Sequence, residues 1–235
     1  MPKAIADGVW IVDSQPVKVA GGMPLPVRMS VLRLANGDLL LHSPTQYRDD
    51  VKQAIAALGP IRHLVAPSIG HWMFLRDWQR ACTEAKTWAV TGLKERSQVR
   101  AAGIRIDDEL GDEPPDAWAG ELDQVFIKAP VFKEVDFFHR ASRTLVLTDL
   151  VLNVEPHELP PMSRVIGRAL GILAPHGKAP AYVRALLLLN RAQTSQAAAR
   201  LVAFNPERVI FAHGRWFERN GAAELRRSLS WLLKT

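Results

Sequence analysis

Three apolar runs of the sequence each lead to a side chain that can bind a metal ion or exchange a proton. HLVAPSIGH ends at His71, RTLVLTD reaches Asp149 and VIFAH reaches His213. Where strands feed helices, ligands bind just beyond the carboxyl ends of the strands, so these side chains are candidates for one shared site. Two imidazoles and one carboxylate suffice for a catalytic Zn²⁺ with an open position, or for non-haem Fe(II).

Each of these residues alone has a simpler explanation. A histidine near a strand end is often a hydrogen-bonded structural residue, and an aspartate after a strand often caps a helix or a turn. The coincidence of three such residues favours a common site. Whether the three residues share a site therefore depends on the helices and strands that position them.

The N-terminal half predicts an antiparallel sheet followed by alternating helices and strands. Residues 8–13 and 27–43 are rich in β-branched and apolar residues, and Asn36-Gly37-Asp38 breaks the second stretch with a hairpin turn signal. Apolar residues at helical spacing predict a helix over 47–58, and a short buried strand follows. The next cycle predicts helices over 72–85 and 93–101 and strands over 87–90 and 104–106.

Residues 107–123 hold eight acidic residues and no basic one, which predicts a surface loop. Beyond it, residues 155–180 contain five prolines and two histidines among helical pieces, which predicts an insertion at 154–185 covering the site face. Strands are predicted at 124–129, 134–139, 143–147 and 209–214, and helices at 181–204 and 222–233.

Length and composition predict a single globular domain over 1–235. The lone Cys82 excludes internal disulfides and CxxC-based zinc sites. No secretory leader is recognisable, and no apolar run approaches the ~20 residues of a membrane span, so we expect a cytoplasmic protein without a membrane span.

The charge is uneven along the chain. Residues 1–161 hold 18 basic and 21 acidic residues, whereas 162–235 hold 12 and 3. A basic C-terminal third could attract nucleic acid or another anionic surface. Because its arginines are scattered at helical spacing, a solvated helix face is the favoured interpretation, and nucleic acid is not the expected partner.

The order and spacing of HLVAPSIGHWMFLRDW, FFHRASRTLVLTDL and VIFAHG resemble the metallo-β-lactamase-like superfamily, and within it the branch described as DUF4336. The resemblance extends from about residue 7 to residue 233, and TLVLTDL and FAHG are its most specific parts. It implies an α/β fold, a four-layer αββα sandwich with two mixed sheets.

The first metal-binding loop of that superfamily reads HxHxDH. Aligned with it, this chain has Pro67 and Ile69 in place of the first two histidines, His71 in place of the aspartate, and Trp72 in place of the last histidine. Trp72 cannot coordinate a metal, because the indole N–H only donates.

The resemblance also implies a further histidine ligand near residues 129–133, where none occurs. Asp149 matches the bridging carboxylate and His213 matches the last histidine. An intact binuclear site is not expected. Two alternatives remain open: a mononuclear site holding one Zn or Fe ion through His71, Asp149 and His213, or a pocket that binds no metal.

Other residues are candidates for the surroundings of the site. His42, Trp72 and His139 are assigned to the pocket or to the support of the ligands, although His139 precedes a turn and has a structural alternative. His157 and His176 lie in the predicted insertion, from which either could enter the site.

The sequence therefore predicts a degenerate member of a hydrolase-like superfamily. If active, it would be a metal-dependent hydrolase of an ester, amide or phosphoester, with an unidentified small molecule as substrate. The alternatives are a non-catalytic module that binds a small molecule or a protein in the same pocket, and a binder of anionic surfaces through the basic C-terminal third. The leucines of the last helix could support a homodimer, or could dock on the sheet.

Overall fold

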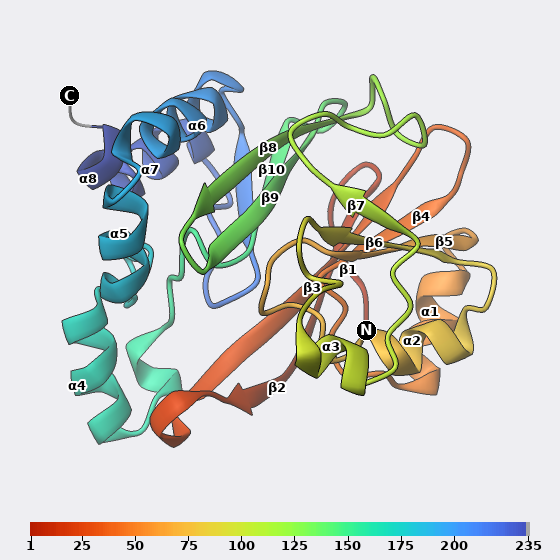
Figure 1. Ribbon diagram of the computed structural model, residues 1–235, viewed down its shortest axis with the longest axis horizontal. Helices are drawn as coiled ribbons and strands as arrows, with labels where there is room; N and C mark the ends of the chain where they lie inside the picture. The colour runs from red at the N-terminus through yellow and green to blue at the C-terminus, as the bar shows by residue number, and fades with distance from the viewer. Residues whose placement is uncertain (234–235) are drawn as a thin grey trace.

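The computed structural model describes residues 1–233, which form two face-to-face β-sheets between two groups of helices (Figure 1). The first sheet has the order β1-β2-β3-β4-β5-β6-β7. Strands β1 to β4 are antiparallel neighbours, and β4 to β7 are parallel neighbours. Its strands are β1 Lys3–Ala6, β2 Val9–Lys18, β3 Pro24–Arg33, β4 Leu39–His42, β5 Ile61–Ala66, β6 Lys86–Val90 and β7 Asp108–Leu110.

The second sheet has the order β11-β10-β9-β8. Strands β8, β9 and β10 are antiparallel neighbours, whereas β10 and β11 run parallel. Both sheets are therefore mixed, as the predicted αββα sandwich requires. Its strands are β8 Leu122–Ala129, β9 Phe132–His139, β10 Thr144–Leu147 and β11 Arg208–Phe211.

Helices cover the outer face of each sheet (Figure 1). The first three lie on the first sheet, and α5 to α8 lie on the second. No helix of the described chain is long and apolar enough to cross a membrane. The helices are α1 Asp49–Ala56, α2 Leu75–Ala81, α3 Ser97–Ala101, α4 Pro161–Leu170, α5 Ala181–Leu188, α6 Arg191–Ala203, α7 Gly221–Ser228 and α8 Ser230–Leu233, with short 3₁₀ turns at Ala20–Gly22 and Pro156–Glu158.

Strand β10 shows why the sequence of the second sheet is continuously apolar. Val146 packs in the core between the two sheets, whereas Leu145 and Leu147 pack in the core beneath the helices. A strand buried on both faces needs apolar residues at every position, which gives a run such as TLVL. The run carries the chain straight through the core to Asp149 at its end.

The predicted β3–β4 hairpin is confirmed, and so is the β4–α1–β5 unit. The strand predicted at 104–106 is wrong. The strand is β7, which lies inside the segment predicted as a loop. Its pairing with β6 begins after residue 106 because of two hydrogen bonds made by Asp107. Its N–H donates to the Thr87 carbonyl at 2.9 Å, and its carboxylate accepts the Thr87 N–H at 2.7 Å.

The helix predicted over 181–204 is two helices, broken at Leu189 and Asn190. Asn190 leaves the helical conformation, with φ −124° and ψ 44°. The Thr194 hydroxyl lies within hydrogen-bond distance of the Leu187 carbonyl at 2.9 Å and the Asn190 carbonyl at 3.0 Å. Both carbonyls also accept backbone N–H groups, from Asn190 and Thr194 respectively, so the Thr194 hydroxyl adds a second contact at the break.

The last predicted helix is also divided, into α7 and α8. Leu225, Leu229 and Leu232 are all fully buried against the second sheet. These leucines therefore dock on the sheet.

The segment between β10 and α5 contains α4 and packs on the end of the β2–β3 hairpin. Met23 and Leu25 of the hairpin share a small core with Leu152, Leu159 and Ile172. Figure 1 shows α4 beside this end of the hairpin. Together they form one wall of the cavity described below.

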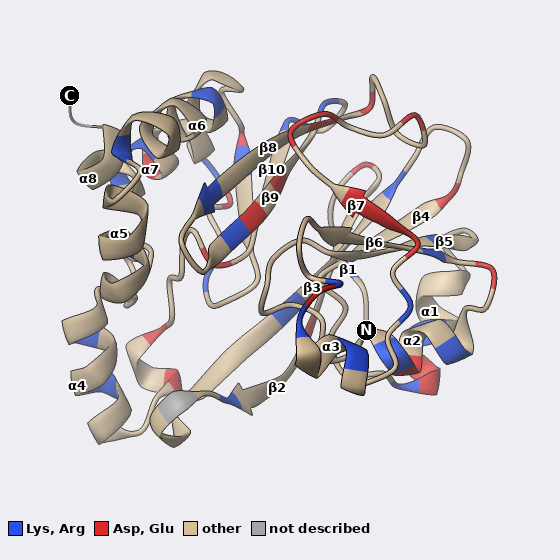
Figure 2. Ribbon diagram, viewed as in Figure 1, with Lys and Arg blue, Asp and Glu red and all other residues tan. Residues whose placement is uncertain are grey.

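The basic residues of the C-terminal third are dispersed, and Figure 2 shows them separated along α4, α6 and α7. Several of them form ion pairs with acidic residues. The partners Asp112 and Glu155 come from outside the C-terminal third and offset part of its positive charge, whereas Glu207 and Glu224 belong to it. The pairs join Arg200 to Asp112, Arg208 to Glu207, Arg215 to Glu155 and Arg227 to Glu224.

Candidate metal centre

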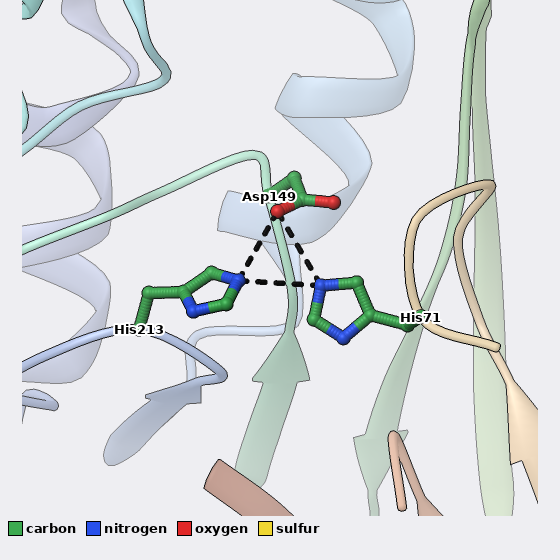
Figure 3. Close-up of side chains that lie close together, drawn as sticks. All are labelled: His71, Asp149 and His213. Carbon is green, nitrogen blue, oxygen red and sulfur yellow. Dashed lines mark hydrogen bonds and ion pairs between the residues drawn. The ribbon is translucent and has the colours of Figure 1, made fainter. Parts of the chain in front are cut away.

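The structure brings His71, Asp149 and His213 together (Figure 3). His71 lies in the loop after β5, Asp149 lies two residues beyond the end of β10, and His213 lies two residues beyond the end of β11. The carboxyl ends of one strand from the first sheet and two from the second therefore meet at one edge of the sandwich.

The separations of the three side chains match those of metal ligands. Nε2 of His71 lies 3.4 Å from Oδ1 of Asp149, Nε2 of His213 lies 3.3 Å from the same oxygen, and the two Nε2 atoms are 3.3 Å apart (Figure 3). Ligand atoms at about 2.0–2.1 Å from a tetrahedral ion lie about 3.3–3.4 Å from one another. These distances exceed the roughly 2.7–3.2 Å of ordinary N–H···O bonds. The donor set fits a single ion.

Hydrogen bonds fix the orientation of both imidazoles. Nδ1 of His213 donates to the carbonyl oxygen of Pro26 at 2.7 Å. Because a carbonyl only accepts, the proton of the neutral ring is on Nδ1, and Nε2 keeps its lone pair toward Asp149. Nδ1 of His71 contacts the Ser43 hydroxyl, which can accept its proton in the same way.

The peptide after His213 explains the FAHG sequence. Gly214 has φ +88°, and a Cβ at this position would lie 2.3 Å from the Asn153 carbonyl oxygen. The backbone packs there because the Arg215 N–H donates to the same carbonyl at 2.8 Å. Glycine is required for the strand end to present His213 to the site.

The charges of the three groups are coupled. Burial opposes ionisation of Asp149, but the neighbouring His71 and His213 outweigh it and hold the pKa of the carboxyl well below its usual range. Burial likewise opposes protonation of His71, but the Asp149 and Glu134 carboxylates raise the pKa of its ring. The Asp149 carboxylate and a protonated His71 ring therefore favour each other.

Glu134 on β9 holds the turn that carries Asp149. It is fully buried and accepts three backbone N–H groups, from Thr148 at 2.6 Å, Asp149 at 2.8 Å and Leu150 at 3.0 Å. The Ser68 hydroxyl donates to the second Asp149 oxygen at 3.0 Å. The carboxylate of Asp149 is thereby fixed from both its backbone and its side chain.

Asp136 lies two residues along β9 from Glu134 and is also fully buried. No N–H or O–H donor within the described chain contacts its carboxyl oxygens. Burial and the Glu134 charge raise the pKa of Asp136 well above its usual range. Burial raises the pKa of Glu134 as well, so the two neighbouring carboxyl groups oppose each other's ionisation.

A cavity of about 470 Å³ opens over the three side chains, within the range typical of small-molecule sites. Its walls are mainly apolar. The β2–β3 hairpin contributes Val19 and Leu25, and the segment from α4 to α5 contributes Leu170 and Leu186. The three candidate ligands form a polar patch in this apolar surface.

The other residues assigned from the sequence have different positions. Trp72 is half-buried and lines the cavity. His42 is buried and lies edge-on to Phe137, with ring centroids 5.1 Å apart. Burial lowers the pKa of His42 to about 3. It has no hydrogen bond to the three candidate ligands within the described chain, so it packs as a neutral ring.

The remaining histidines lie outside the cavity. His139 is close to Gly8 and contacts the Ser142 hydroxyl at 2.7 Å, so the structure does not bring it to the pocket. His176 contacts Arg227, and His157 is exposed beside Glu155.

Pro67 and Ile69 join their loop to β9 through backbone hydrogen bonds. The Pro67 carbonyl accepts the Val135 N–H at 2.8 Å, and the Ile69 N–H donates to the Lys133 carbonyl at 3.3 Å. The loop after β5 is thereby attached to β9.

Glu134 was not identified from the sequence. Because β9 also contains Lys133, Asp136 and His139, its sequence does not single out Glu134.

Comparisons with known proteins identify the family of the chain and its fold. A model of the family described as "Domain of unknown function (DUF4336)" matches residues 6–176, more than half of the chain. No curated protein matches the sequence.

Solved structures share the fold at low identity. The metallo-β-lactamase from Pontibacter korlensis is 14% identical and aligns over 100% of this chain and 99% of its own, with a TM-score of 0.65. The enzyme from Hirschia baltica is 14% identical, with coverages of 99% and 97% and a TM-score of 0.63. The rubredoxin oxygen:oxidoreductase from Desulfovibrio gigas is 13% identical, with coverages of 99% and 61% and a TM-score of 0.67. The chain therefore belongs to the DUF4336 family and has the metallo-β-lactamase fold.

Proposed function

We propose that this protein is a metal-dependent hydrolase with a mononuclear centre held by His71, Asp149 and His213. The observation that carries the proposal is the triangle of Nε2, Oδ1 and Nε2 atoms, whose edges of 3.3–3.4 Å equal those of a tetrahedral ligand set. Two imidazoles and one carboxylate suit Zn²⁺ and also non-haem Fe(II). The sequence changes at Pro67 and Ile69 limit the centre to one ion.

The chain's own residues prepare the donor atoms. The Pro26 carbonyl keeps the Nε2 lone pair of His213 directed to the centre, and the Ser43 hydroxyl orients His71. Glu134 and Ser68 fix the two oxygens of Asp149. An ion bound there would supply Lewis acidity and lower the pKa of water toward about 7. The apolar walls would exclude bulk water from an ester, amide or phosphoester bound beside these residues.

Metal analysis of protein purified without chelator tests the proposal. We expect about one equivalent of zinc or iron for the wild type and almost none for His213→Ala. His157→Ala is the matched control, because it removes an exposed histidine outside the cavity and should keep the metal. A wild type with less than about 0.2 equivalents, unchanged by His213→Ala, would refute the mononuclear centre.

A second candidate is a non-catalytic module that binds a small molecule in the same cavity. The replacement of three ligand positions by Pro67, Ile69 and Trp72 favours it, since none of these side chains coordinates a metal. This candidate predicts ligand binding by the protein at full affinity after metal removal. It also predicts no hydrolysis after zinc or iron is added.

A further inference from the structure

The cavity contains one feature that the candidate metal centre does not use. Among its lining residues in the described chain, Arg96 is the single lysine or arginine. Arg96 directly precedes α3 and is half-buried, and its Nε is buried without a hydrogen-bond partner. No carboxylate of the described chain forms an ion pair with its guanidinium.

An unpaired guanidinium on a cavity wall is unusual, because a half-buried cation lacks part of its hydration. Arginine binds carboxylates and phosphates with two parallel hydrogen bonds, which makes it a specific receptor for such groups. An anionic group of a ligand would supply the partner that the protein does not.

The rest of the cavity wall is mainly apolar. The β2–β3 hairpin presents Val17, Val19 and Leu25, and the segment from α4 to α5 presents Leu170, Ile172 and Leu186. In Figure 1, α4 stands on one side of the hairpin end and α3 stands on the other. The apolar wall and Arg96 line the same cavity as His71, Asp149 and His213.

We propose that the cavity binds an acylated small acid. Its acyl chain would lie on the apolar wall, its carboxylate or phosphate would bind Arg96, and the ester or amide bond between them would lie beside the candidate metal centre. The position of the cleaved bond rests on the proposed function, whereas binding of the two ends does not. In hydrolysis, water adds across that bond and releases the fatty acid and the small acid.

Isothermal titration of the metal-free protein in EDTA tests the two ends separately. The probes are the N-acylglycines with hexanoyl, octanoyl, decanoyl and dodecanoyl chains. Each is matched by its N-acylglycinamide, which lacks only the charge. Burial of one methylene should tighten binding about fourfold, so each two-carbon step should tighten it about 16-fold until the cavity is filled. An affinity independent of chain length would overturn the apolar site.

Arg96→Gln tests the anion site. It should weaken N-acylglycine binding by about 10–100-fold and change N-acylglycinamide binding by less than about twofold. Lys94→Gln is the matched control, because it removes the same charge two residues away from an exposed side chain that does not line the cavity. Equal effects of the two variants would overturn the assignment of Arg96. The corresponding acylaminoethyl phosphate compares the two anionic groups, and the tighter ligand identifies the preferred one.

Because the titrations are performed in EDTA, they test ligand binding independently of the proposed metal centre. If binding depends on chain length and on Arg96, the class of ligand is supported even if metal analysis finds no ion. If the metal is present and these effects are absent, only the substrate class fails.

Discussion

Glu134→Gln tests whether the buried carboxylate on β9 positions the candidate ligand Asp149. The amide retains one oxygen, whereas the carboxylate accepts the Thr148 N–H on one oxygen and the Asp149 and Leu150 N–H groups on the other. In its best orientation the glutamine therefore leaves the Thr148 N–H without an acceptor. A buried N–H without a partner costs about 1–3 kcal/mol, and replacing a charged acceptor weakens the remaining bonds by about 1 kcal/mol each.

Removal of the buried charge offsets part of this loss. We therefore expect Glu134→Gln to lower the free energy of unfolding by about 2–4 kcal/mol. Because the turn loosens around Asp149, we also expect zinc affinity to fall by about 10–100-fold, as for other groups that support metal ligands.

The assays are urea unfolding of the metal-free protein and a competition titration of zinc against a chromophoric chelator. Ile55→Ala is the matched control, because Ile55 is a fully buried residue of α1 and its truncation should also cost about 2–5 kcal/mol. The control should keep the zinc affinity of the wild type, because α1 does not line the cavity. If Glu134→Gln retains both stability and zinc affinity, or if Ile55→Ala loses as much affinity, the positioning role of Glu134 is wrong.

Three further predictions concern the same region. Zinc affinity should rise about tenfold per pH unit up to the raised pKa of His71 and then level off, because binding displaces one proton; a flat profile between pH 5 and 8 in competition titrations would contradict this. His42 has a folded-state pKa of about 3 against 6.5 when unfolded, so the unfolded chain binds the extra proton and stability falls as the pH drops through this interval. Between pH 6.5 and 4.5 the loss is about 2 kcal/mol, and urea unfolding in EDTA should show a smaller loss for His42→Leu than for the wild type. Gly214→Ala should destabilise the protein by at least about 2 kcal/mol, because its Cβ would lie 2.3 Å from the Asn153 carbonyl oxygen; a melting temperature equal to that of the wild type would argue against the close approach.

The sequence was informative about strands and their ends. The apolar runs before Asp149 and His213 are strands buried on both faces, so their length and position follow from composition alone. The three strand ends already suggested one shared site, whereas the face-to-face arrangement of two sheets that brings His71 to Asp149 and His213 came from the resemblance to a known fold.

Features that depend on tertiary contacts could not be predicted from the sequence. The start of β7 is held by two hydrogen bonds between Asp107 and Thr87, and the break after α5 is accompanied by a contact of the Thr194 hydroxyl with the Leu187 carbonyl. Glu134 and Arg96 are ordinary charged residues in the sequence. Only their burial and their partners, or lack of partners, distinguish them.

Anomalous diffraction from crystals grown with zinc tests the central claim most directly. We predict one strong anomalous peak that lies about 2.0–2.2 Å from Nε2 of His71, Oδ1 of Asp149 and Nε2 of His213. Absence of a peak among these three atoms, in crystals soaked to saturation near pH 8, would contradict the mononuclear centre.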